Sequence, residues 1–206
     1  MVAYKTVRSE ASNEFIERRS RFIGYAKPVT TEDDAISFIH KIKSKNWNAT
    51  HNVYAYAIRE GQIKRYSDDG EPQGTAGIPV LDVILKSEVT NVVIVTTRYF
   101  GGVLLGTGGL VRAYSHSASI ALEQAQIVTM QQCKLAELTC DYNQYGRISA
   151  LIPDCSGFMD DTAFGELVKI NFHMSETNFA GFEKQLADDT CGQVQPTIIG
   201  EKFFAV

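Results

Sequence analysis

A glycine-dense segment between a strand-like run and a helix constrains this sequence more than any other feature. Five of the 16 glycines in the chain lie in residues 101–109, which we call the glycine loop. The β-branched run at residues 92–97 precedes it and suits a buried strand. Residues 109–126 follow with a helical spacing that brings Leu110, Tyr114 and several small side chains to one face. Small residues allow a helix to pack closely on a sheet, so we predict layered α/β packing here.

The C-terminal part of the chain predicts the element order β-α-β-β-α-β. This is the ferredoxin-like, split βαβ order, in which two helices cover one face of an antiparallel sheet. We expect its six elements at residues 134–140, 143–151, 158–164, 166–174, 177–188 and 193–203.

The N-terminal part mixes strands and helices in a less regular order. We expect paired strands around the turn at Ser20, and a helix over residues 31–45 that Thr30 or Thr31 caps. The remaining elements are expected at residues 52–58, 63–66 and 78–85, with a turn at 61–62.

The charge balance divides the chain near residue 130. Residues 1–130 carry a net charge of +2 and residues 131–206 a net charge of −6, which together give the formal net charge of −4. We therefore predict an α+β protein of two domains, 1–130 and 131–206. An acidic domain repels a phosphate backbone, so any contact with nucleic acid is expected from the N-terminal domain.

Composition excludes several classes of protein. Hydrophobic residues make up 44% of the chain and charged residues 21%, which is typical of soluble globular proteins rather than disordered ones. No apolar run approaches the roughly 20 residues of a membrane-spanning helix, and no secretory signal is recognisable, so a cytoplasmic protein is expected. The four cysteines show no zinc-ligand spacing, and we expect no metal and no cofactor.

Residues 68–77, which we call the acidic loop, hold three carboxylates and three glycines. Asp68, Asp69 and Glu71 are suited to binding a cation or a substrate, or to acid and base catalysis. The same loop is equally suited to capping the helix that begins near Thr75. The sequence leaves both interpretations open.

The glycine loop carries a second candidate site. Backbone amides at such a strand-to-helix turn can bind an anion, and Arg98 and Arg112 lie at its two edges. The segment matches neither a Walker A loop nor a Rossmann fingerprint. The alternative is tight packing that requires small residues. His51 and His116 are further candidates, although single histidines more often serve only as hydrogen-bonding residues.

These segments together resemble the YigZ/IMPACT family. The resemblance lies in residues 68–77, in residues 98–114 with their Arg-Tyr-Phe-Gly-Gly start, and in residues 49–56 around His51. It implies an N-terminal two-layer α/β domain, similar to one in a small-subunit ribosomal protein and to domain IV of elongation factor G. It also implies a ferredoxin-like C-terminal domain similar to domain V of that factor. Eukaryotic members regulate translation by competing for the activator of a kinase that phosphorylates an initiation factor.

The first functional hypothesis is a non-enzymatic binding protein linked to translation, with RNA, the ribosome or a translation factor as its partner. Its net charge argues against a dedicated RNA binder. The alternatives are a hydrolase or transferase acting on a phosphorylated or carboxylated small molecule, and a module for protein interaction. The predicted binding residues are His51, Tyr54, Asp68, Asp69, Glu71, Arg98, Tyr99, Gly101, Gly102, Gly106, Gly108, Gly109 and Arg112.

Overall fold

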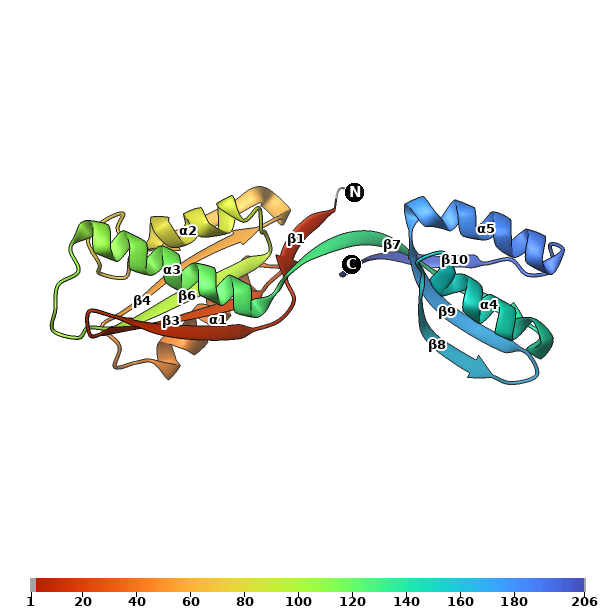
Figure 1. Cartoon of the computed structure of the whole chain (residues 1–206), viewed down its shortest axis with the longest axis horizontal. Helices are drawn as coiled ribbons and strands as arrows, with labels where there is room; N and C mark the ends of the chain where they lie inside the picture. Colours follow the sequence, from red (N-terminus) through yellow and green to blue (C-terminus); the bar gives the residue numbers. More distant parts are fainter. Residues whose placement is uncertain (1–2, 206) are drawn as a thin grey trace. The chain divides into compact units, whose positions relative to one another are not determined.

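The computed structural model describes residues 3–205 and contains two compact units (Figure 1). The first runs from Tyr4 to Thr129, and the second begins at Met130. The prediction of a two-domain α+β protein is confirmed. The boundary between the units falls at the position along the chain where the charge balance changes.

The N-terminal unit is built on an antiparallel sheet of five strands. Their spatial order is β2-β3-β6-β4-β5. The central strand β6 holds the predicted β-branched run, and its residues 92–97 are all buried. The bounds are Ala11–Glu17 for β2, Ser20–Pro28 for β3, His51–Ile58 for β4, Ile63–Ser67 for β5 and Val92–Tyr99 for β6.

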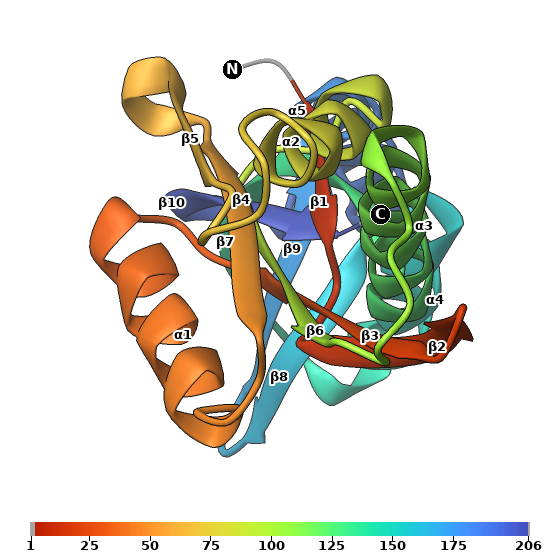
Figure 2. The same cartoon turned by 90° about the vertical axis from the view of Figure 1, so that its left-hand side faces the viewer.

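Helices cover both faces of this sheet (Figure 2). Helix α1 (Glu32–Lys45), which Thr31 caps, packs on one face, while α2 (Gly77–Lys86) and α3 (Thr107–Ala125) pack on the other. Alternate residues of the central strands enter the two cores, so both faces of the strands are apolar. Helix α1 thus adds a layer to the two that the resemblance implied for this domain. A short 3₁₀ helix, η1 (Glu60–Gln62), joins β4 to β5.

The C-terminal unit follows the predicted element order. Its antiparallel strands have the spatial order β10-β7-β9-β8, and α4 and α5 share one core with one face of the sheet. The bounds are Ile127–Cys140 for β7, Tyr142–Asp154 for α4, Phe158–Phe164 for β8, Val168–Ser175 for β9, Glu176–Thr190 for α5 and Thr197–Ala205 for β10.

Two strands differ from the expectation. Strand β1 (Tyr4–Val7), which pairs with β7, was not predicted from the sequence. Strand β7 begins at Ile127, seven residues before the predicted start, directly after Gln126 ends α3 with a φ of 58°. None of the described helices is long and apolar enough to cross a bilayer.

Candidate binding site at the glycine loop

Arg98 lies near the end of the central strand β6, and its side chain is buried. The residue is only 4% exposed, between the rings of Phe22 and Phe100. Its Nη1 is 2.6 Å from Oε1 of Glu71, and its Nη2 donates to the hydroxyl of Ser20 at 3.3 Å. Within residues 3–205 its buried Nε–H has no hydrogen-bond partner. Both terminal nitrogens of Arg98 therefore have a partner inside the domain.

Glu71 is the centre of this buried network. Besides Arg98, the hydroxyl of Tyr114 in α3 donates to Oε1 of Glu71 at 2.7 Å. Burial, and then the charge of Glu71, raise the pKa of Tyr114 above its usual value, so the phenol stays protonated as a donor. His51 lies on the other side, with its Nε2 3.8 Å from Glu71 Oε1. Its Nδ1 donates to the carbonyl of Asp69 at 2.8 Å.

The two aspartates of the acidic loop have structural partners. Asp68 accepts hydrogen bonds from the amides of Gly74, Ala76 and Gly77, and so it caps the start of α2. Asp69 pairs with Lys43 at 2.6 Å and accepts from the amide of Asn52. Within residues 3–205, no group of three or more His, Cys, Asp or Glu side chains could hold a metal ion. Of the three carboxylates, only Glu71 faces the glycine loop.

The glycine loop packs against the β2–β3 hairpin. A Cβ at Gly101 would overlap the carbonyl of Arg19, and the Gly101 amide donates to Ser20 Oγ at 3.2 Å. Gly106 precedes α3 with a φ of 72°, a conformation that favours glycine. Of the other predicted glycines, Gly102 is exposed in the loop, and Gly108 and Gly109 lie in the first turn of α3.

Residues of the acidic loop and of the glycine loop line one cavity of about 440 Å³. Glu71 and Pro72 line it from the acidic loop, and Arg98 and His51 contribute from the adjacent strands. The glycine loop and its neighbours supply a largely apolar wall of Phe100, Leu104, Leu105, Gly106, Thr107 and Leu110. The cavity therefore combines the Arg98–Glu71 ion pair, in which the two charges balance, with a largely apolar lining.

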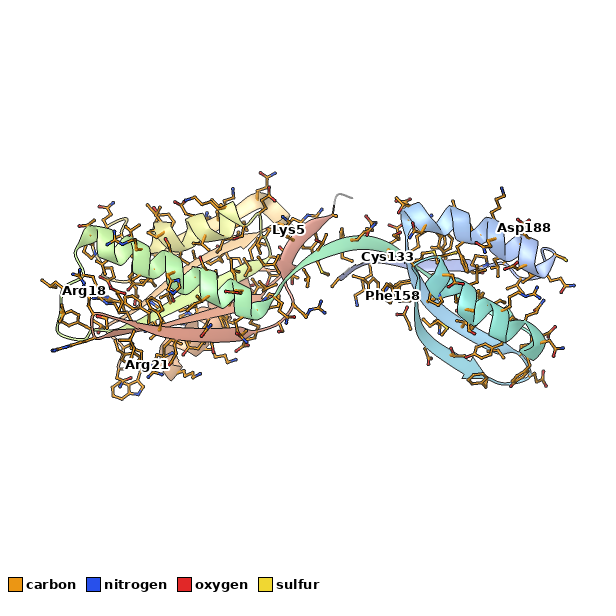
Figure 3. The ribbon with its side chains drawn as sticks, viewed as in Figure 1. Lys5, Arg18, Arg21, Cys133, Phe158 and Asp188 are labelled. Carbon is orange, nitrogen blue, oxygen red and sulfur yellow. The ribbon has the colours of Figure 1, made fainter. Side chains whose placement is uncertain are left out.

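Arg112 lies in a different hollow, on the other side of Leu105. This second hollow has a volume of about 260 Å³ and is lined by Arg18 and Glu17 from the hairpin and by Arg112 and His116 from α3. Figure 3 shows Arg18 at the tip of the β2–β3 hairpin, beside the loop that leads into α3. Arg98 and Arg112 thus line separate hollows.

The two predicted tyrosines do not line either hollow. Tyr54 stacks with Tyr56 and lies under the ammonium group of Lys43. The hydroxyl of Tyr99 donates to Asn46 at 3.1 Å, and the guanidinium of Arg21 lies over its ring. Both rings help to pack the domain.

Three exposed apolar side chains at this end of the domain were not among the predicted site residues. Trp47 and Leu104 are 82% and 81% exposed, and Phe100 is 46% exposed. Arg18 and Arg19 form the turn of the hairpin. Their only signal in the sequence was two consecutive arginines before Ser20, the expected turn.

Comparisons with known proteins agree with this architecture. The Impact N-terminal domain model matches residues 18–122, and a domain of unknown function, DUF1949, matches residues 138–193. The chain belongs to the IMPACT family. Its two matched segments fall in the two units of the structure, and the resemblance inferred from the glycine and acidic loops is confirmed.

Bacterial relatives match over most of the chain. IMPACT family member YvyE of Bacillus subtilis is 36% identical, over 93% of this chain and 88% of the length of YvyE. IMPACT family member YigZ of Escherichia coli is 34% identical, over 89% of this chain and 92% of its own. Protein IMPACT of Rattus norvegicus is 35% identical over a shorter stretch, 44% of this chain and 30% of its own. A crystal structure of a hypothetical protein has a TM-score of 0.61 and 30% identity, and covers 97% of this chain and 98% of that one.

Proposed function

We propose that this chain is a cytoplasmic, non-enzymatic binding protein that acts in translation. Its N-terminal domain would contact RNA, the ribosome or a translation-associated protein with the end that carries the glycine loop. The carrying observation is the apolar surface of that loop, where Leu104 is 81% exposed and borders the cavity. A loop that exposes apolar side chains beside a cavity is typical of an interaction site.

The family supports the link to translation. Relatives named IMPACT occur in a mammal as well as in bacteria, and the resemblance to that family implies translation regulation. The proposal extends this role to a bacterial-type, two-domain chain.

The buried network supports binding more than catalysis. Arg98 and Glu71 neutralise each other, Asp68 caps α2, and Asp69 is paired with Lys43. To act in a hydrolase or transferase, these carboxylates would have to exchange a present partner for a substrate group in the transition state. His51 has its Nε2 at the cavity wall, but the carboxylate nearest to it is already shared by two donors.

Sedimentation of the tagged protein through a sucrose gradient tests the proposal. We expect the wild type to travel with ribosomal fractions, and Leu104→Asp to remain at the top of the gradient. The matched control is Ile199→Asp in the C-terminal domain, where Ile199 is 55% exposed and lies in β10. Treatment with nuclease before sedimentation separates a partner that requires intact RNA from a protein partner. A wild type that never leaves the top fractions would contradict the proposal, as would a control that loses sedimentation equally.

A further inference from the structure

The tip of the β2–β3 hairpin is a two-residue turn made of Arg18 and Arg19. Glu17 pairs with Ser20 across it, and both arginines have positive φ, 44° and 71°. Such turns favour Asn-Gly, because side chains with a Cβ resist positive φ. The backbone conformation of this turn therefore disfavours arginine at both positions.

Arg18 lies beside Arg112 and His116 of α3, and Arg19 follows it in the turn; we call these four residues the arginine patch. Arg18, Arg112 and His116 line the same hollow of about 260 Å³. Arg19 is held next to the glycine loop, because its carbonyl lies against Gly101. Within residues 3–205, no hydrogen bond or ion pair involves the side chains of Arg18, Arg19 or Arg112.

The neighbouring charges leave the patch positive. Glu17 is the carboxylate that lines the hollow, against Arg18, Arg112 and the adjacent Arg19. Glu14 is engaged by Arg21 at 2.6 Å, so it does not neutralise the patch. Three exposed guanidinium groups with free donors are suited to phosphate oxygens, which they bind with bidentate hydrogen bonds.

Exposed aromatic rings lie at the same end of the domain. Phe100 immediately precedes Gly101, which contacts the arginine turn. Trp47 precedes Asn48, whose side chain accepts from the hydroxyl of Tyr99, and Tyr99 is paired in the sheet with Arg21. Single-stranded RNA offers both phosphates for arginines and bases that stack on exposed rings. An acidic protein segment offers carboxylates, but it lacks a planar base beside each charge.

We infer that the arginine patch binds the phosphate backbone of single-stranded RNA, with Phe100 as a stacking surface for a base. This inference rests on the proposed function, since it names the partner chemistry of the same end of the domain. It also moves the anion contact from Arg98, which Glu71 neutralises, to Arg18, Arg19 and Arg112.

Fluorescence anisotropy with a labelled oligouridylate of about 12 nucleotides tests the inference on the full chain. The key variant is Arg18→Asn with Arg19→Gly, because Asn-Gly suits the turn and keeps the hairpin intact. We expect its affinity to fall at least about tenfold at about 50 mM salt. Its plot of log affinity against log salt should lose about 1.4 from its slope, or about 0.7 for each phosphate contact removed.

The matched control removes two charges elsewhere, by Lys64→Gln with Lys86→Gln. Lys64 pairs with Ala57 at the opposite end of β4 from His51, and Lys86 lies in the last turn of α2. We expect this control to bind RNA within about twofold of the wild type. A turn variant that binds like the wild type overturns the inference, and so does a control that weakens binding equally.

Two further measurements separate RNA from an acidic protein partner. Phe100→Ser should weaken RNA binding about fivefold or more without changing the salt slope, because stacking carries no charge. A labelled oligoglutamate peptide of equal charge should bind much more weakly than the RNA. Equal affinity for the peptide, together with no effect of Phe100→Ser, would make an acidic protein the ligand and overturn the inference.

The two proposals fail in distinguishable ways. Wild-type protein that sediments with ribosomes, while the turn variant still binds RNA normally, contradicts only the arginine patch. Loss of RNA binding by the turn variant, in a protein that never sediments with ribosomes, contradicts only the role in translation.

Discussion

Arg98 and Arg112 flank the same glycine loop but lie in opposite environments. Arg98 is buried, paired with Glu71 and enclosed by two aromatic rings. Arg112 is exposed beside Arg18, and its side chain makes no hydrogen bond or ion pair within residues 3–205. The charge of Arg98 therefore serves to hold the domain together, whereas the charge of Arg112 is available to bind a ligand. Equal residue types at the edges of one loop do not imply one site.

Replacing the two arginines should give the largest contrast. Arg98→Ala leaves the buried carboxylate of Glu71 without its cation, and we expect the free energy of unfolding to fall by about 3 to 5 kcal/mol. Arg112→Ala should change it by less than about 0.5 kcal/mol, because the side chain is exposed. Urea unfolding followed by circular dichroism measures both. Similar losses for the two variants would contradict the comparison.

The buried side should also respond to alkaline pH. Because the pKa of Tyr114 is raised, the unfolded chain loses this proton near pH 10 while the folded protein keeps it. The stabilising contribution is therefore complete below about pH 10 and declines as the pH rises further.

Tyr114→Phe removes this titrating group and its hydrogen bond to Glu71. We expect a loss of about 1.5 to 3 kcal/mol at neutral pH and a shallower decline in stability above about pH 10. Urea unfolding at several values between about pH 8 and pH 11 measures both effects, with the exposed Tyr66→Phe as the control. An unchanged alkaline slope would show that Tyr114 is not held protonated by its surroundings.

The smallest effect is expected at the hairpin turn, and it has the opposite sign. Arg18→Asn with Arg19→Gly relieves two positive-φ side chains, so the variant should be as stable as the wild type or more stable by about 1 kcal/mol. Thermal unfolding and urea unfolding together measure this change. A marked loss of stability would mean that the arginines are structural, and the two sides of the loop would then be alike.

Much of the fold could be predicted because the hydrophobic pattern reports local structure. The run at residues 92–97 became the central strand, and the six C-terminal elements occur in the predicted order. Strand β1 was missed because its four residues are too few to show alternation. The third layer was missed because the pattern shows that a strand is apolar on both faces without showing which helix covers each face.

The sequence by itself determined the family, the two-domain α+β class and the importance of the two loops. Only the tertiary structure decided the partners of the charged residues. Glu71 meets Arg98 across 27 positions of the chain, and Gly101 meets Ser20 across 81. Strand register creates such contacts, and register depends on packing between distant segments rather than on local spacing. For that reason the sequence could single out Arg98 as a candidate site residue. It could not show that Arg98 is buried and paired with Glu71, or that Arg18, Arg19 and Arg112 form a separate patch.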